Sequence, residues 1–255
     1  MPVKSKFYDL YGSFATAFMM FSIIPVPFKK REEGSFSYVY LFFPLVGAIE
    51  GALFYFLAIF LFNRGYGNLI RGAVLAAFPL VFTGGIHMDG FLDTVDAFFS
   101  YGSRDRKLEI LKDPHVGSFA VIAGGLYLML SFAFFGSLER ERLYLIPVSF
   151  LLSRILSALS VLFFNAAKTT GTIHPFKEAS DRFVKVSLII LLILTLSVIF
   201  LLFGVKSLIP VLAGGVVFLL HYLNCSKNFG GITGDLAGAF LQVFELVFVG
   251  CVVMI

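Results

Sequence analysis

The stretch VSLIILLILTLSVIFLLF, residues 186–203, contains no charged residue and is decisive for the fold class. A helix needs about 20 mostly apolar residues to cross the hydrocarbon core of a membrane. The apolar residues here are continuous and do not alternate with polar ones, which favours a helix over a strand of a transmembrane barrel. This stretch therefore predicts a membrane-spanning helix.

Similar apolar runs recur along most of the chain. The predicted spans are residues 36–62, 70–86, 116–138, 143–164, 186–203, 208–223 and 236–255. The segment 14–28 is shorter and contains Pro25 and Pro27 near its end, so we expect it to be re-entrant or to lie at the membrane interface. The sequence predicts an all-α, polytopic bundle of about seven transmembrane helices, with residues 1–255 forming one domain.

The composition supports a membrane protein and excludes several other classes. The 255 residues are 58% hydrophobic and 14% charged, whereas a soluble domain has about 25% charged residues. The mean hydropathy is +0.92. The net charge of +4 is small and lies in short loops, which predicts no binding to nucleic acid. The two cysteines, Cys225 and Cys251, are too far apart to form a CxxC motif.

The distribution of basic residues predicts the orientation in the membrane. Seven spans divide the loops into two sets, of which one comprises residues 1–35, 87–115, 165–185 and 224–235. That set holds 14 of the 20 lysines and arginines, and the other set holds five. Because basic loops stay on the cytoplasmic side, we expect the first set there. The loops richest in polar residues then share one side and could form one site.

The stretch GGIHMDGFLDTVDAFFSYGSRDRKLEILKDPHVG, residues 84–117, contains most of the candidate chemistry. Asp89, Asp93 and Asp96 are spaced i, i+4 and i+7, which places them within about 60° on one face of a helix. Their mutual repulsion is relieved by a cation, and carboxylates are ligands that Mg²⁺ prefers. We therefore predict that these three residues bind Mg²⁺. The alternative is an acidic helical turn in a solvated loop.

Other residues of this stretch suit a phosphate-containing ligand. Gly84, Gly85 and Gly90 allow a backbone to approach a ligand closely. Arg104, Arg106, Lys107 and Lys112 supply positive charge, and we select Arg104 and Lys112 as phosphate contacts. His87 and Asp113 are candidate catalytic groups, although a structural role for His87 is equally open.

A second polar stretch, GGITGDLAGAFLQVFE, occupies residues 230–245. Asp235 lies in the predicted first turn of a helix, where it either favours the helix terminus or contributes to the site. Ionisable residues inside apolar spans are costly and are usually functional or paired. Arg154 lies in such a span, and it either pairs with Glu50 or Glu245 or belongs to the functional site. These features predict an intramembrane, Mg²⁺-dependent enzyme that acts on a phosphorylated substrate.

The motif GGIHMDGFLDTVDAF and the following LKDPHVGSF resemble the adenosylcobinamide-GDP ribazoletransferase (cobalamin synthase) family. The segments IIPVPF near residue 24, FPLVGAIEGAL at residues 43–53, Ser153-Arg154 and GGITGDLAGAFLQVFELVF at residues 230–248 are also similar to that family and occur in the same order. The segment at residues 165–180 is less typical. The resemblance covers most of the chain.

This resemblance implies a particular reaction. The cobinamide phosphate moiety would pass from its GDP-activated form to a hydroxyl of α-ribazole, or of its 5′-phosphate, with release of GMP. It also implies Mg²⁺ as cofactor and a multi-pass location in the cytoplasmic membrane of a prokaryote, with the site on the cytoplasmic side. The expected partners are these substrates and the lipid bilayer, while a homo-oligomer or a complex with other biosynthetic enzymes remains open.

Two alternative functions compete with this one. A CDP-alcohol phosphatidyltransferase would have Ala-Arg two residues after the first Asp-Gly, whereas here Asp89-Gly90 is followed by Phe91-Leu92-Asp93. A secondary transporter could use Glu50, Arg154 or Glu245 as a proton or substrate site. It would leave the polar cluster between His87 and Asp113 unexplained.

Overall fold

The computed structural model describes residues 3–27, 36–167 and 173–255, and it omits the side chains of residues 3–8. Within these ranges the regular structure is helical, and the only β-type pairing is one isolated bridge between Ala166 and Ile232. The longer helices are α1 (Val3–Phe21), α2 (Val39–Asn63), α3 (Asn68–Thr83), α4 (Ile86–Phe99), α6 (Ser118–Ser137), α7 (Ile146–Phe163), α9 (Arg182–Phe203), α10 (Leu208–Asn224) and α11 (Gly234–Met254). Shorter helical segments are α5 (Arg104–Ile110), η2 (Arg140–Leu145), α8 (His174–Ala179), η3 (Gly204–Ser207) and η4 (Cys225–Phe229). The predicted all-α class is confirmed.

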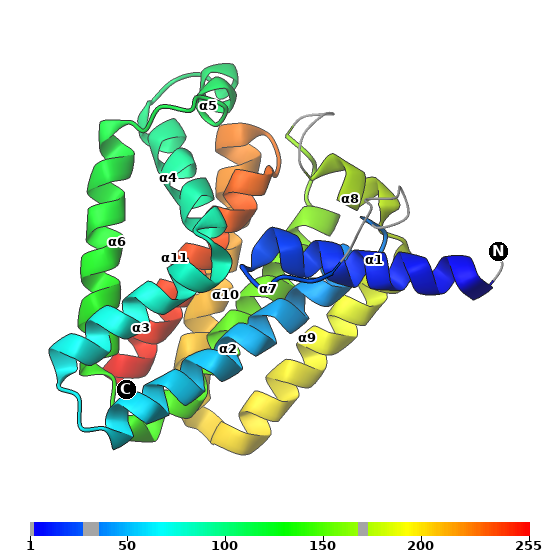
Figure 1. Ribbon diagram of the computed structural model, residues 1–255. Coiled ribbons are helices and arrows are strands. Elements are labelled where there is room, and N and C mark those ends of the chain that lie inside the picture. The colour runs from blue at the N-terminus through cyan, green and yellow to red at the C-terminus, as the bar shows by residue number, and fades with distance from the viewer. Residues whose placement is uncertain (1–2, 28–35, 168–172) are drawn as a thin grey trace.

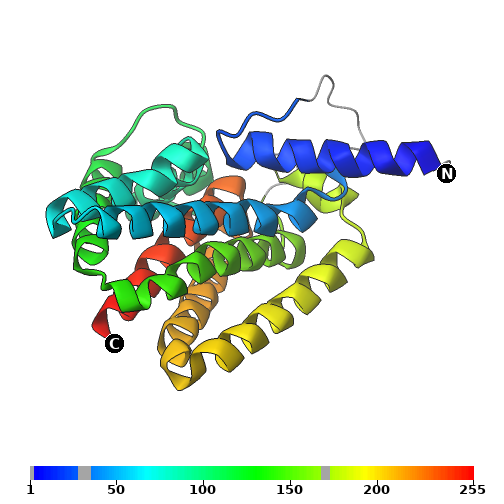
Figure 2. The same ribbon diagram turned by 60° about the horizontal axis from the view of Figure 1, so that its bottom comes forward.

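The described chain contains five helical stretches that are long and apolar enough to cross a membrane, or six if a bent pair forms one span. The five are Val39–Asn63, Ser118–Ser137, Arg140–Phe163, Arg182–Phe229 and Gly234–Met254. The fourth has 48 residues, so it would be about 72 Å long if straight, more than twice the thickness of the hydrocarbon core. Figures 1 and 2 show that the chain turns at η3, and α9 and α10 therefore correspond to two separately predicted spans.

The bent pair consists of α3 and α4, which meet at 94°. Gly84 and Gly85 form the bend with φ of 63° and 77°, a left-handed conformation that costs other residues about 1–2 kcal/mol. Their amides donate to the carbonyls of Val81 and Leu80, which satisfies the end of α3. Residues 87–115, counted from the sequence as a connection between spans, begin with the helix that the spacing of Asp89, Asp93 and Asp96 predicts, and this helix packs within the bundle.

The N-terminal helix α1 lies across one end of the bundle, as both views show. It begins well before residue 14, where the sequence placed the start of a short apolar segment. The hydroxyl of Ser13 accepts a hydrogen bond from the amide of Tyr38 (3.2 Å), and the amide of Ile23 donates to the carbonyl of Phe82 (2.8 Å). Helix α1 is not among the candidate spans.

The connections sort to the two ends of the bundle as the sequence predicts. One end carries α5, α8, η4 and the start of α11, and we call it the α5 end (Figure 1). The turns after α2, α6 and α9 lie at the opposite end. Four of the basic residues used to predict orientation, at positions 29–31 and 168, lie outside the described residues, as do the side chains of residues 4 and 6.

Helices α7 and α11 form the centre of the bundle. Within the most apolar window of each candidate span, 78% of the residues are buried for Arg140–Phe163 and 72% for Gly234–Met254. For Arg182–Phe229 the share is only 11%. Helices α9 and α10 therefore present most of their apolar side chains outward, as expected for a surface that contacts lipid.

Candidate active site

The site is built on the contact between α4 and α11 at the α5 end. Gly90 allows this contact, since a Cβ atom at that position would lie 2.8 Å from the carbonyl oxygen of Asp235. Helix α11 begins here because the hydroxyl of Thr233 accepts a hydrogen bond from the amide of Leu236 (3.2 Å). The sequence predicted that Gly90 admits a ligand, whereas the structure shows that it admits the backbone of a neighbouring helix.

Four carboxyl groups gather where these two helices meet. The carboxyl of Asp93 lies within electrostatic range of those of Asp89, Asp235 and Asp96. None of the ion pairs formed by the described residues involves Asp89 or Asp93. Their negative charge is therefore not balanced by a basic side chain in direct contact.

Asp96 differs from the other aspartates because its carboxylate is already engaged. It accepts hydrogen bonds from the amides of Gly117 (2.5 Å) and Ala120 (2.8 Å). These amides belong to the N-cap residue and the first turn of α6, where backbone donors lack partners within the helix and the helix dipole favours a negative charge. Asp96 thus connects α4 to the start of α6, a contact that spacing along one helix could not reveal.

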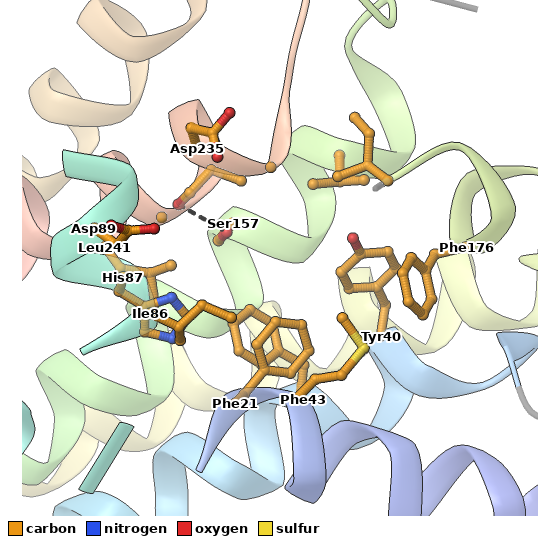
Figure 3. Close-up of a pocket in the computed structure, with 16 residues that line it drawn as sticks. Phe21, Tyr40, Phe43, Ile86, His87, Asp89, Ser157, Phe176, Asp235 and Leu241 are labelled. Carbon is orange, nitrogen blue, oxygen red and sulfur yellow. Dashed lines mark hydrogen bonds between the residues drawn. The ribbon is translucent and has the colours of Figure 1, made fainter. Parts of the chain in front are cut away.

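A cavity lies beside this group of carboxylates, between α1, α2, α4, α7, α8 and α11. Figure 3 shows His87 and Asp89 on one side, Tyr40 and Phe176 on the other, and Ser157 and Asp235 between them. The cavity volume is about 120 Å³. Polar groups from four helices converge on it, so segments that are distant in sequence form one site.

His87 lies in the wall of this cavity and is only 3% exposed. Its ring lies 5.9 Å from the ring of Phe21 and 6.0 Å from that of Phe43, measured between centroids. Its Nε2 atom has no hydrogen-bond partner among the described residues. A buried polar atom without a partner is costly, so this nitrogen remains available to a ligand that enters the cavity.

The basic residues proposed from the sequence take different positions. Arg104 donates to the carbonyl of Ala167 (3.1 Å), and its guanidinium lies against the backbone of Gly230. It thereby holds together three connections of the α5 end. Lys112 is exposed and does not line the cavity.

Asp113, a predicted catalytic residue, lies on the connection between α5 and α6 and does not line the cavity. Its carboxylate accepts hydrogen bonds from the amide of His115 (3.0 Å) and contacts the Nδ1 atom of the same residue (2.7 Å). These bonds hold the pKa of Asp113 below its ordinary value. The structure therefore does not bring Asp113 together with His87, Asp89 and Asp235.

Arg154 lies in the middle of α7 and is almost fully buried. Its guanidinium pairs with Glu50 of α2 (2.7 Å) and with Glu245 of α11. Glu245 also accepts a hydrogen bond from the hydroxyl of Ser153 (2.8 Å). Of the two alternatives for Arg154, the structure shows the ion pairs, and Arg154 does not line the cavity.

Tyr40 and Ser157 are cavity residues that the sequence did not single out. Tyr40 belongs to an apolar helix, and the hydroxyl of Ser157 donates to the carbonyl of Ala237 (3.3 Å), the hydrogen bond drawn in Figure 3. Neither belongs to a motif with recognisable spacing. Only the packing of α2 against α7, and of α7 against α11, brings them to the cavity.

Fold and site together define a polytopic helical membrane protein with a carboxylate-lined cavity at one end of its bundle. The family model described as cobalamin-5-phosphate synthase matches residues 13–253. The chain belongs to that family.

Curated relatives agree with this assignment. A protein of Lachnoclostridium phytofermentans named adenosylcobinamide-GDP ribazoletransferase is 40% identical over 235 residues, which cover 90% of this chain and 88% of the relative. Proteins of the same name from Geobacillus sp. and Desulfitobacterium hafniense are 38% and 34% identical, covering 80% and 88% of this chain and 80% and 90% of their own lengths. No solved structure matches the chain. The match decides against the two alternative families considered from the sequence.

Proposed function

We propose that this protein transfers the cobinamide phosphate moiety of a GDP-activated corrinoid to a hydroxyl of α-ribazole, or of its 5′-phosphate, and releases GMP. The observation that carries this proposal is the family match, because residues 13–253 include every residue that lines the cavity. The relatives' name, adenosylcobinamide-GDP ribazoletransferase, describes this reaction. The product is a cobalamin, so the reaction is the last assembly step of its nucleotide loop.

The residues of the site fit a magnesium ion. Among the described residues, no three His, Cys, Asp or Glu side chains form a ready-made metal site. Mg²⁺ does not require one, since it typically keeps several waters and binds one or two carboxylates together with substrate phosphates. Asp89 and Asp93 carry carboxylates on adjacent turns of α4, and Asp235 lies across from them on α11. When bound, Mg²⁺ would neutralise charge that develops on the transferring phosphoryl group.

The residues of the cavity wall have separate tasks in this proposal. The unpartnered Nε2 of His87 accepts the proton, or a hydrogen bond, of the attacking hydroxyl. The rings of Phe21 and Phe43 restrict the orientation of His87 and exclude water from its side of the cavity. The hydroxyl of Tyr40 on the opposite side contacts the substrate.

We further propose that the α5 end faces the cytoplasm of a prokaryotic cell, where a GDP-activated substrate is available. The excess of basic residues in the connections at this end supports this orientation. It can be tested with single cysteines at Ser103 and Ser226, both exposed at the α5 end, and at Glu141 at the opposite end, in a variant without the native cysteines. In oriented vesicles the first two should react with an impermeant thiol reagent from the cytoplasmic side and the third from the other side. Labelling of Ser103 and Ser226 from opposite sides would contradict a single site.

The activity itself is tested with the purified protein in detergent micelles. We expect GMP release from GDP-activated cobinamide only when α-ribazole and Mg²⁺ are both present. Omission of α-ribazole separates transfer from hydrolysis, and chelation of Mg²⁺ tests the metal. Absence of GMP under all of these conditions would overturn the proposal.

A further inference from the structure

A second cavity lies between α4, α10 and α11, on the opposite face of α4 from the aspartates. Its volume is about 430 Å³, larger than that of the cavity beside the carboxylates. Phe91, Phe98, Phe99 and Phe240 supply much of its apolar wall. We call it the α10 groove. Leu220 and Leu223 of its α10 wall are exposed, so the groove adjoins the surface that contacts lipid.

The groove is graded from polar to apolar along its length. Asn224, Lys227 and Asn228 lie at the α5 end, and Val217 and Val243 lie deeper. A molecule that fills the groove therefore has a polar group at the membrane surface and an apolar body below it.

The polar end of the groove is positively charged. Lys227 lines this end, and Lys107 of α5 is buried next to it without lining the groove: its Nζ donates to the side-chain oxygen of Asn228 (2.9 Å) and lies over the rings of Phe98 and Phe229. Neither Lys107 nor Lys227 takes part in any of the ion pairs of the described residues. A buried lysine without a carboxylate in contact favours a nearby anion.

A polar atom next to the groove also lacks a partner. Thr94 lines the groove and is 8% exposed as a residue, and its hydroxyl is buried without a hydrogen bond to the described residues. Leaving such a donor unsatisfied costs about 1–3 kcal/mol. A rotation of the Thr94 side chain about χ1 would turn this hydroxyl toward the groove, where a ligand with a carbonyl oxygen below its charged group would satisfy it.

We propose that the α10 groove binds one anionic glycerophospholipid, with the phosphate at Lys227, the ester carbonyl near Thr94 and an acyl chain along the phenylalanines. A lipid of this kind matches the change from polar to apolar residues along the groove, the positive charge at its polar end and the hydroxyl of Thr94 that lacks a hydrogen-bond partner among the described residues. An anionic headgroup gains about 1 kcal/mol from each nearby lysine at a membrane surface. The site is separate from the cavity beside the carboxylates, and the proposal does not depend on the transfer reaction.

The first test compares full-length protein in nanodiscs of phosphatidylcholine with protein in nanodiscs that also contain phosphatidylglycerol. Retained lipid is counted by native mass spectrometry after release from the nanodisc. We expect one phosphatidylglycerol to remain bound in preference to phosphatidylcholine. Lys227→Gln should lower this preference about fivefold, the loss of one lysine–headgroup attraction. Lys206→Gln, exposed at the opposite end, is the matched control and should leave the preference unchanged.

The second test fills the groove. Ala239→Phe places a ring where the acyl chain would lie and should abolish retention of phosphatidylglycerol. Ala133→Phe adds the same bulk to the exposed face of α6 and should leave retention unchanged. Equal retention in Ala239→Phe and the original protein would overturn the proposal. An Ala239→Phe protein that retains its lipid and shows a raised KM only for α-ribazole would also overturn the proposal. In that case the groove would bind the acceptor substrate. If Ala239→Phe does not fold, the Lys227→Gln measurement decides.

Discussion

The protein contains two groups of carboxylates that differ in how their charge is balanced. Glu50 and Glu245 lie deep in the bundle and share Arg154, which the chain itself provides. Asp89 and Asp93 lie near the α5 end beside a cavity and have no basic side chain in contact among the described residues. The carboxylates of the first group therefore have a cation of the chain in direct contact, whereas those of the second have none within the described ranges and leave room for a ligand cation.

The largest expected effect is that of removing Arg154. Arg154→Met leaves two buried carboxylates without their partner, and breaking a buried ion pair in this way costs about 3–5 kcal/mol. We expect a large drop in the free energy of unfolding, measured by denaturant titration in micelles. The combined variant Glu50→Gln, Arg154→Met, Glu245→Gln removes all three charges and should recover most of that stability and the activity. A stable but inactive triple variant would place this group in the catalytic machinery.

Removing one of the unbalanced carboxylates should lower the activity and leave the stability nearly unchanged. Asp89→Asn and Asp93→Asn keep the shape of the side chain but remove its charge, so the rate of GMP release should fall about 10²–10³-fold, as when a transition-state contact is lost. The melting temperature should stay close to that of the original protein. Asp105→Asn, at an exposed position on α5, is the matched control. Near-normal turnover of both variants at limiting Mg²⁺ would remove these residues from the site.

The contact between the two helices of the site can be tested at Gly90. Gly90→Ala places a Cβ atom 2.8 Å from the carbonyl oxygen of Asp235, and such overpacking costs about 1–3 kcal/mol. We expect lower stability together with a lower rate, because Asp235 moves away from α4. Gly125→Ala on α6 meets no atom within 4 Å and should change neither quantity. An unchanged rate in Gly90→Ala would show that the α4–α11 spacing does not matter for activity.

The smallest effect is expected at Asp96. Asp96→Asn leaves an oxygen acceptor for only one of the amides of Gly117 and Ala120, places an NH₂ group against the other and loses the favourable charge at the start of α6, which together cost about 1–2 kcal/mol of stability. The rate should remain within about tenfold of the original, because this carboxylate is already engaged. A rate loss as large as that of Asp93→Asn would place Asp96 with the metal ligands and add it to the group formed by Asp89 and Asp93.

The sequence predicted those parts of the fold that depend on apolar runs. The spans that became α2, α6, α7, α9, α10 and α11 are long, apolar and bounded by polar residues. The search for apolar runs did not find helix α4, because three aspartates interrupt the apolar residues of the segment 86–99. Its position in the bundle is favoured by Gly90, whose significance appears only when the backbone of Asp235 is beside it.

The sequence predicted part of the geometry of the candidate site. The spacing of Asp89, Asp93 and Asp96 correctly placed them on one helix, and the glycine-rich start of α11 pointed to Asp235. Helical periodicity could not show that Asp96 turns to the start of α6 or that Asp113 pairs with His115. The first contact joins two elements whose relative positions are set by tertiary packing, and the second is a local contact within the connection between α5 and α6.

The pairing of α4 with α11 also affects how the protein is made. Gly90 and Asp235 are about 145 residues apart, so at roughly 5–20 residues per second the ribosome synthesises α11 about 7–30 s after α4. Helices α3 and α4 have 16 and 14 residues, each fewer than the roughly 20 needed to cross a membrane alone. During this interval the nascent chain holds a carboxylate-bearing helix that lacks its partner, and a chain released before residue 234 would enter the membrane without a site and be a substrate for quality-control proteases.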